Sequence, residues 1–182
     1  MKFTTTLLVF FLITACSGSG SSGSADPQSE IFTEVYSADL APLNNSSATG
    51  NARVNILNDN LQVNLTLNNA DGGIHPQHIQ VGTRCPVLEQ DDANHNGKID
   101  PEEALKAYGD SLVNLGDDLT RNGGGFPNGS NYKYDSLASL SQLLGNLNIA
   151  KLILQGHVVT VLGLTAVGAA VPIACGVLKR VE

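Results

Sequence analysis

The sequence predicts a mainly β protein built from antiparallel strands, and three observations support this. Apolar and polar residues alternate along residues 52–56 and again along 61–67, the pattern of strands with one buried and one solvated face. Two apolar, β-branched runs at 157–162 and 171–181 are typical of buried strands. Helix signals are confined to short segments. These features together indicate a β domain carrying small helical additions.

The first half of the chain divides into four extended segments. Residues 31–40 predict an opening strand. Residues 52–57 and 61–67 predict a hairpin, because Asn58-Asp59-Asn60 is typical of a turn. Extended structure then resumes at Ile74–Gly82, where Pro76 indicates an edge or a bulge.

The second half contains the predicted helices. Pro101–Tyr108 begins with a proline and two acids, which favour the first turn of a helix. Residues 109–131 are rich in Gly and Asn and predict a loop. Residues 132–154 predict a second hairpin-like region, with a short helix at 136–144.

An uncharged run at Val158–Val177 has about the length of a transmembrane helix. Gly163, Gly168 and Pro172 interrupt it, and β-branched residues dominate both of its halves. We therefore predict two buried strands, at 157–162 and 171–181, in place of a membrane span.

The N-terminus predicts secretion. Lys2 precedes an apolar core at residues 7–13 that is too short to span a bilayer, as in a signal peptide comprising residues 1–15. Ile13-Thr14-Ala15-Cys16 resembles the lipobox of bacterial lipoproteins. This resemblance implies that Cys16 is acylated, and Ser17 then favours the outer membrane. The alternative is an ordinary cleaved signal with an incidental cysteine.

The expected domain organisation follows from this N-terminus. Residues 16–30 predict a lipidated, flexible Ser/Gly tether, and residues 31–182 predict one β domain with an insertion at 86–131. The formal charge of −7 argues against nucleic acid as a partner. It argues equally against binding to anionic lipid, so the expected membrane contact is only the lipid anchor that the lipobox resemblance implies on Cys16.

The three cysteines agree with an extracytoplasmic location. Lipidation of Cys16 leaves Cys85 and Cys175 as an even pair in an oxidising compartment. We predict a disulfide between them that closes a loop of about 90 residues. The alternative is two free, buried thiols.

Residues 92–103, DANHNGKIDPEE, match the calcium loop of an EF-hand. A hard cation needs six to eight oxygen ligands, so the chain must coil and point short carboxylates and amides inward. The Lys98 main-chain carbonyl would supply one ligand. The expected side-chain ligands are Asp92, Asn94, Asn96, Asp100 and Glu103.

Two apolar or small positions complete the pattern. Gly97 supplies a positive-φ turn, and Ile99 is expected to fix the loop to the domain.

Because only three ligands are carboxylates, we expect one Ca²⁺ with a dissociation constant near ~10⁻⁴–10⁻³ M. The ion is expected to be structural, since the loop lacks two long flanking helices. The alternative is an Asx-rich surface turn before a helix.

Three further motifs resemble the copper/zinc superoxide dismutases. Ile74-His75-Pro76-Gln77-His78-Ile79-Gln80 is similar to their copper-ligand strand. His157-Val158-Val159-Thr160 resembles a later ligand strand, and Ala174-Cys175-Gly176-Val177 resembles the closing strand. The resemblance implies an antiparallel Greek-key β-sandwich, a fold that also occurs in CHRD domains, and a disulfide from the closing strand to a loop cysteine.

The copper ligands of this resemblance are incomplete. His78 keeps one histidine, but Gln80 and Thr160 occupy two other ligand positions. Copper is therefore not expected, and the alternative is a degenerate site formed by His75, His78 and His157. No motif for a catalytic nucleophile or a zinc protease occurs. The sequence thus favours a non-enzymatic envelope lipoprotein. The alternatives are a copper oxidoreductase and a calcium-dependent adhesin or carbohydrate-binding module.

Overall fold

A computed structural model describes residues 33–116, 125–144, 154–164 and 168–181. The signal segment, Cys16 and the tether lie outside these residues. The described residues are mainly β with three short helices, which confirms the predicted class. The elements are β1 (Thr33–Pro42), β2 (Thr49–Leu57), β3 (Asn60–Asn68), β4 (Gln77–Gln80), α1 (Leu88–Asp91), α2 (Pro101–Tyr108), β5 (Ser111–Asn114), β6 (Tyr132–Ser139), α3 (Leu140–Leu144), β7 (Val158–Leu164), β8 (Ala170–Val177) and β9 (Lys179–Arg180).

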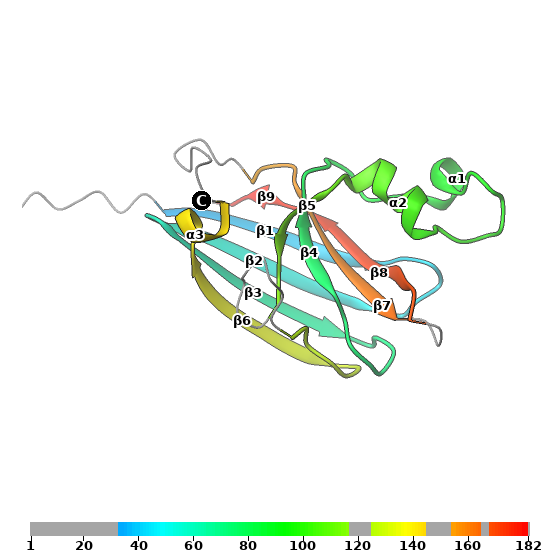
Figure 1. Cartoon of the computed structure of the whole chain (residues 1–182), viewed down its shortest axis with the longest axis horizontal. Helices are drawn as coiled ribbons and strands as arrows, with labels where there is room; N and C mark the ends of the chain where they lie inside the picture. Colours follow the sequence, from blue (N-terminus) through cyan, green and yellow to red (C-terminus); the bar gives the residue numbers. More distant parts are fainter. Residues whose placement is uncertain (1–32, 117–124, 145–153, 165–167, 182) are drawn as a thin grey trace, which may run out of the picture. The chain divides into compact units, whose positions relative to one another are not determined.

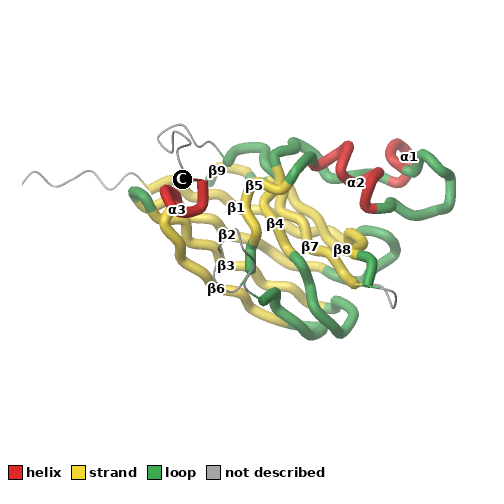
Figure 2. The backbone as a smooth tube through the Cα atoms, viewed as in Figure 1, coloured by secondary structure: helices red, strands yellow, loops and turns green. Residues whose placement is uncertain are grey.

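The strands form one continuous antiparallel sheet that curls into a half-barrel (Figure 1, Figure 2). Their order is β5-β4-β7-β8-β1-β2-β3-β6, and β9 pairs with β1. Strand β1 joins the two halves of the sheet. Residues 33–40 pair with β2, whereas Ala41 and Pro42 pair with β8. A curled sheet whose halves face each other is compatible with the predicted sandwich.

The hairpin of β2 and β3 confirms the prediction made from the alternation of apolar and polar residues. Leu57 pairs with Asn60, so the turn comprises residues 58 and 59. Asn58 adopts a φ of 54°, the left-handed conformation that Asn tolerates better than most residues. The apolar positions of both strands face the interior and are buried: Ala52, Val54, Ile56, Leu61, Val63, Leu65 and Leu67.

Two predictions for the middle of the chain are wrong. Residues 111–114 form strand β5 instead of loop, because they pair with β4 and bury Val113. Residues 132–139 form β6, which pairs with β3, and residues 145–153 of the predicted hairpin-like region lie outside the described part of the chain. The helix predicted at 136–144 begins only at Leu140, since Ser136–Ser139 belongs to β6. Pairing between strands far apart in the sequence decides these cases, and a local sequence pattern carries no information about such pairing.

The uncharged run at 158–177 contains strands β7 and β8, as predicted, and not a membrane span. The two strands pair antiparallel, with a register shift beside Leu162. Val159 and Val161 face the interior, while Val158 and Thr160 face the opposite side of the sheet. In the described part of the chain, no helix has the length and apolar character needed to cross a bilayer.

Hydrogen bonds connect the two ends of the curled sheet. The Tyr132 hydroxyl of β6 donates to Oε1 of Gln77 in β4 at 3.0 Å. The Tyr134 hydroxyl donates to the main-chain oxygen of Gly116, just after β5, at 2.5 Å. The main core fills the space enclosed between these ends.

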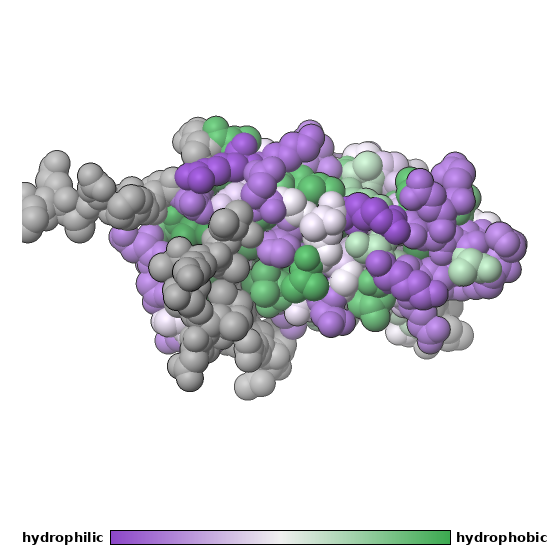
Figure 3. Space-filling view, turned by 90° about the horizontal axis from the view of Figure 1, so that it is seen from above, coloured by the Kyte–Doolittle hydropathy of each residue, from purple (hydrophilic) through white to green (hydrophobic). Residues whose placement is uncertain are grey.

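The outer face of β7 and β8 is covered by the chain between β4 and β5, here called the β4–β5 segment (residues 81–110). A second, smaller apolar cluster lies beneath it, consisting of Ile99, Ala104, Tyr108, Val158 and Cys175. Helices α1 and α2 of this segment lie at the right-hand end of Figure 1. In Figure 3 the same end presents mainly hydrophilic residues to solvent. The segment therefore has a polar outer side and an apolar inner side.

Candidate metal centre

The base of the β4–β5 segment is fixed to the sheet. Cys85 and Cys175 of β8 form the predicted disulfide, with an S–S distance of 2.04 Å. The main-chain nitrogen of Gly82 donates to the oxygen of Tyr108 at 2.6 Å. A Cβ atom on Gly82 would lie 2.3 Å from the Tyr108 backbone, so this close approach requires glycine.

Helix α1 is held by an ion pair. The Arg84 guanidinium donates to both carboxylate oxygens of Asp91, at 2.6 and 2.7 Å. This interaction holds the pKa of the Asp91 carboxyl below its usual value. The pair is partly solvated, so its contribution to stability is small. It joins Arg84 to the last residue of α1, directly before Asp92.

The predicted calcium loop coils around the Asp92 side chain. Its Oδ1 accepts from the Asn96 N–H at 3.0 Å, and its Oδ2 accepts from the Gly97 N–H at 2.8 Å. Gly97 has a φ of 78°, which confirms the expected positive-φ turn, and His95 has a φ of 57°. The backbone thus adopts a tight coil with the side-chain oxygen of Asp92 inside it.

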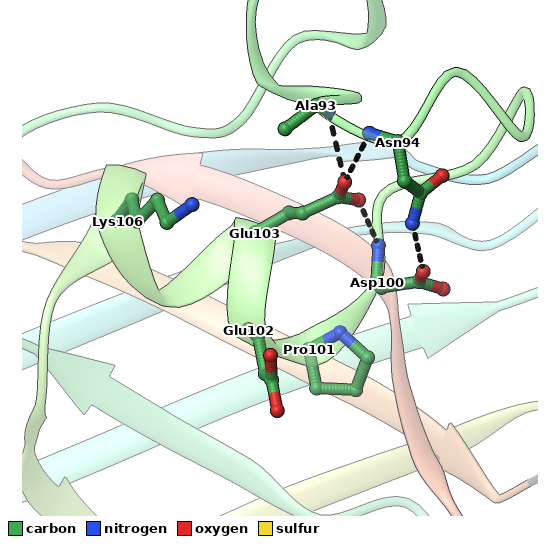
Figure 4. Close-up of a pocket in the computed structure, with 7 residues that line it drawn as sticks. All are labelled: Ala93, Asn94, Asp100, Pro101, Glu102, Glu103 and Lys106. Carbon is green, nitrogen blue, oxygen red and sulfur yellow. Dashed lines mark hydrogen bonds between the residues drawn. The ribbon is translucent and has the colours of Figure 1, made fainter.

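Glu103 closes the loop from helix α2 (Figure 4). Its Oε1 accepts from the main-chain N–H groups of Ala93 and Asn94, at 2.8 and 3.1 Å. Its Oε2 accepts from the N–H of Asp100 at 2.8 Å, so Glu103 also caps the start of α2. The residue is only 5% exposed. Glu103 therefore connects the two ends of the loop.

The remaining candidate ligands meet at Asp100. The side-chain amides of Asn94 and Asn96 both donate to Asp100 Oδ2, at 2.8 and 2.9 Å. A cation binds amide oxygens and not these nitrogens. Rotation of each amide group would exchange the positions of its nitrogen and oxygen. In the described ranges, no three His, Cys, Asp or Glu side chains are close enough together to hold a metal ion. To bind one ion together, the three carboxylates of the loop would therefore have to move closer to one another.

Ile99 fixes the loop to the domain, as the sequence predicts. It is 2% exposed and packs in the outer cluster with Tyr108 and Cys175. The neighbouring Lys98 is exposed, and its N–H donates to Asn96 Oδ1 at 2.9 Å. The side chain of Asn44, from the turn after β1, contacts the main chain of Ile99. The calcium-loop motif does not include Asn44, which lies 55 residues before Ile99 in the sequence.

Among the described residues, the histidines of the alternative copper site belong to no group of three side chains that could hold a metal ion. His75 is buried, and both of its ring nitrogens lie against main-chain oxygens, at 3.2 Å from Leu162 and 2.8 Å from Asp71. His157 directly precedes β7, with Nδ1 at 3.2 Å from the oxygen of Val81. The ring nitrogens of His75 are therefore not free for a metal.

His78 lies on the outer face of β4 and pairs with Thr160 of β7. Burial lowers the pKa of its imidazole, which favours the neutral ring. Beside it, the Gln80 amide donates to the Thr160 hydroxyl at 3.1 Å. Gln80 and Thr160, which the resemblance to the superoxide dismutases aligns with copper ligands, thus bond to each other. The described residues do not fit a copper centre of the expected kind.

Together, fold and loop define a mainly antiparallel β domain with a coiled, oxygen-rich loop packed on its outer face. Comparison with protein-family models finds no match for the chain, and comparison with curated proteins finds no similar sequence.

Proposed function

We propose that the loop from Asp92 to Glu103 binds one Ca²⁺. The observation that supports this most directly is the backbone coil around Asp92, which receives the N–H groups of Asn96 and Gly97. Such a coil brings oxygens at alternate positions toward one point, as calcium coordination requires. The proposed ligands are side-chain oxygens of Asp92, Asn94, Asn96, Asp100 and Glu103, with the Lys98 carbonyl.

Binding requires local rearrangement in two places. The Asn94 and Asn96 amides must exchange nitrogen for oxygen, and Glu103 must give up N–H donors to reach the ion. Each lost hydrogen bond costs about 1 kcal/mol, which the ion must offset. With only three carboxylates in the set, this cost supports a weak site, in the ~10⁻⁴–10⁻³ M range of extracellular modules.

The role of the ion is proposed to be structural. The loop carries Ile99 into the outer cluster over β7 and β8, so ordering the loop also stabilises that cluster. Helix α1 contains only four residues, none of them buried. So short a helix gives no lever arm by which ion binding could open a groove.

The cellular setting is proposed from the sequence and the disulfide. A bond between Cys85 and Cys175 suits an extracytoplasmic compartment. With the lipobox-like Ile13–Cys16, this supports a lipoprotein held in the bacterial envelope through acylated Cys16, in the outer membrane on the basis of Ser17. Mass spectrometry of membrane-extracted protein tests this, since an unmodified N-terminus at residue 16 contradicts it.

A relationship of fold to the superoxide dismutases is also proposed. Its support is a row of three residues across neighbouring strands: His78 pairs with Thr160, which pairs with Cys175. These residues come from the three motifs that resemble that family. Copper chemistry is not proposed, because Gln80 and Thr160 bond to each other. Stoichiometric copper with superoxide-consuming activity in purified protein would reverse this choice.

Calorimetric titration with Ca²⁺ tests the proposal. Wild-type protein is expected to bind one equivalent, and Glu103→Ala is expected to bind at least about tenfold more weakly because it loses a ligand and the loop closure. Glu102→Ala is the matched control, since Glu102 is the adjacent, exposed acid. Absence of binding heat in the wild type, or equal loss in both variants, contradicts the proposal.

A further inference from the structure

Asn44 lies in the turn between β1 and β2, far in sequence from the loop it contacts. Its φ is 54°, in the left-handed region, and its side chain is half-buried. The turn lines a shallow pocket together with Gly97 and Ile99 from the middle of the loop. Asn44 is thus the point at which the sheet and the loop meet through a polar side chain.

The Asn44 amide satisfies both main-chain groups of Ile99. Its Oδ1 accepts from the Ile99 N–H at 2.6 Å, and its Nδ2 donates to the Ile99 oxygen at 2.9 Å. This reciprocal pair is the one that two residues exchange in an antiparallel ladder. One side chain therefore replaces a neighbouring strand at Ile99.

The position of that amide is fixed by β8. Asn44 Nδ2 also donates to the oxygen of Pro172 at 3.0 Å. On either side in the turn, the Leu43 N–H donates to the oxygen of Ile173 at 2.8 Å, and the Ser46 hydroxyl donates to the same oxygen at 2.5 Å. The turn is thus bonded to strand β8 independently of its contact with the loop.

We propose that Asn44 is a positioning residue for calcium, an inference that rests on the proposed function of the loop. Ile99 stands between two proposed ligands, the Lys98 carbonyl and Asp100. Fixing both main-chain groups of Ile99 holds these ligands in place before the ion arrives, which lowers the entropic cost of binding. Asn44 itself contributes no atom to the ion.

The test compares Asn44→Ala with Asn45→Ala by calorimetric titration with CaCl₂. Asn45 is the matched control, because it is adjacent and exposed and has a similar φ of 57°. Both substitutions therefore carry the same backbone strain. We expect Asn44→Ala to weaken calcium binding about tenfold and Asn45→Ala to change it less than about twofold. Asn44→Asp keeps the acceptor alone and is expected to weaken binding about threefold.

Amide hydrogen exchange measured without calcium provides a second readout. The Ile99 N–H is expected to be protected in wild type and to exchange faster in Asn44→Ala. A purely structural Asn44 would lower the melting temperature with and without calcium by the same amount and leave the affinity unchanged, which would overturn the inference. If the wild type binds no calcium, the loop proposal and the positioning role both fall; equal affinity of wild type and Asn44→Ala overturns the positioning role alone.

Discussion

The interior of the curled sheet and the β4–β5 segment are stabilised in different ways. The interior is a continuous set of buried apolar side chains contributed by every long strand. The β4–β5 segment has a small cluster, and otherwise depends on single connections: the disulfide, the Arg84–Asp91 pair, Glu103 and Asn44. Distributed burial tolerates the loss of one contact better than a set of single connections does.

The difference follows from sequence pattern. Alternation in β2 and β3 buries every second residue, so each strand contributes several apolar side chains to one core. The β4–β5 segment alternates neither as a strand nor as a long helix. A segment that buries little must be held by covalent and polar bonds, and the proposed ion belongs to the same category.

Loss of the disulfide is expected to have the largest effect on stability. The bond joins residues separated by 90 positions. On the chain-entropy model, Cys85→Ser should lower the free energy of unfolding by about 4 kcal/mol. Urea denaturation measures this, and Cys175→Ser should give a comparable loss. A loss below about 1 kcal/mol would show that the segment is held by its other connections.

Truncation in the sheet interior is expected to come next. Leu65 is 1% exposed, and Leu65→Ala should cost about 3 kcal/mol through lost burial and the cavity left behind. Leu137→Ala is the control, because Leu137 is 63% exposed and should change stability by less than about 0.5 kcal/mol. Equal losses in the two variants would contradict the description of the core.

Truncation of Ile99 should separate the two regions. Ile99→Ala is expected to cost about 2 kcal/mol, but the loss should be confined to the β4–β5 segment because its cluster is small. Hydrogen exchange should accelerate at Ala104 and Tyr108 and remain slow in β2 and β3. Faster exchange in β3 would show that the two regions unfold together.

The smallest expected effect concerns His78, at the boundary of the two regions. Burial lowers the pKa of its imidazole in the folded state below the value in the unfolded chain. The unfolded chain therefore binds the proton more tightly, and stability should fall as the pH drops below about 6.5. NMR titration of the ring measures the pKa, and His78→Gln should remove this part of the acid sensitivity. A pKa at or above the ordinary value would contradict the prediction.

Much of the fold could be predicted from local pattern. The β2–β3 hairpin was predictable because its alternation and its Asn-Asp-Asn turn agree, and α2 because Pro101 marks its start. Strand β5 was not predictable, since four residues in a Gly-rich stretch carry too little pattern and depend on pairing with β4. The single curled sheet depends on β1 pairing with both β2 and β8, which no local signal specifies.

The candidate loop shows the same division. Gly97 and Ile99 could be assigned because the loop pattern gives each position a physical role, and the structure confirms both. Whether the oxygens bind calcium stays a prediction. Asn44 could not be found from sequence, because its role comes from a turn that approaches Ile99 only after the strands have paired.

The hydrogen bonds between the two ends of the sheet, from Tyr132 to Gln77 and from Tyr134 to Gly116, affect how readily the protein aggregates at high concentration. Unpaired strand borders invite strands of other molecules to add on, a common start of aggregation. Here the two borders turn toward each other, and β5 comprises only four residues. Copies at high concentration would therefore find little template at β5 for joining edge to edge.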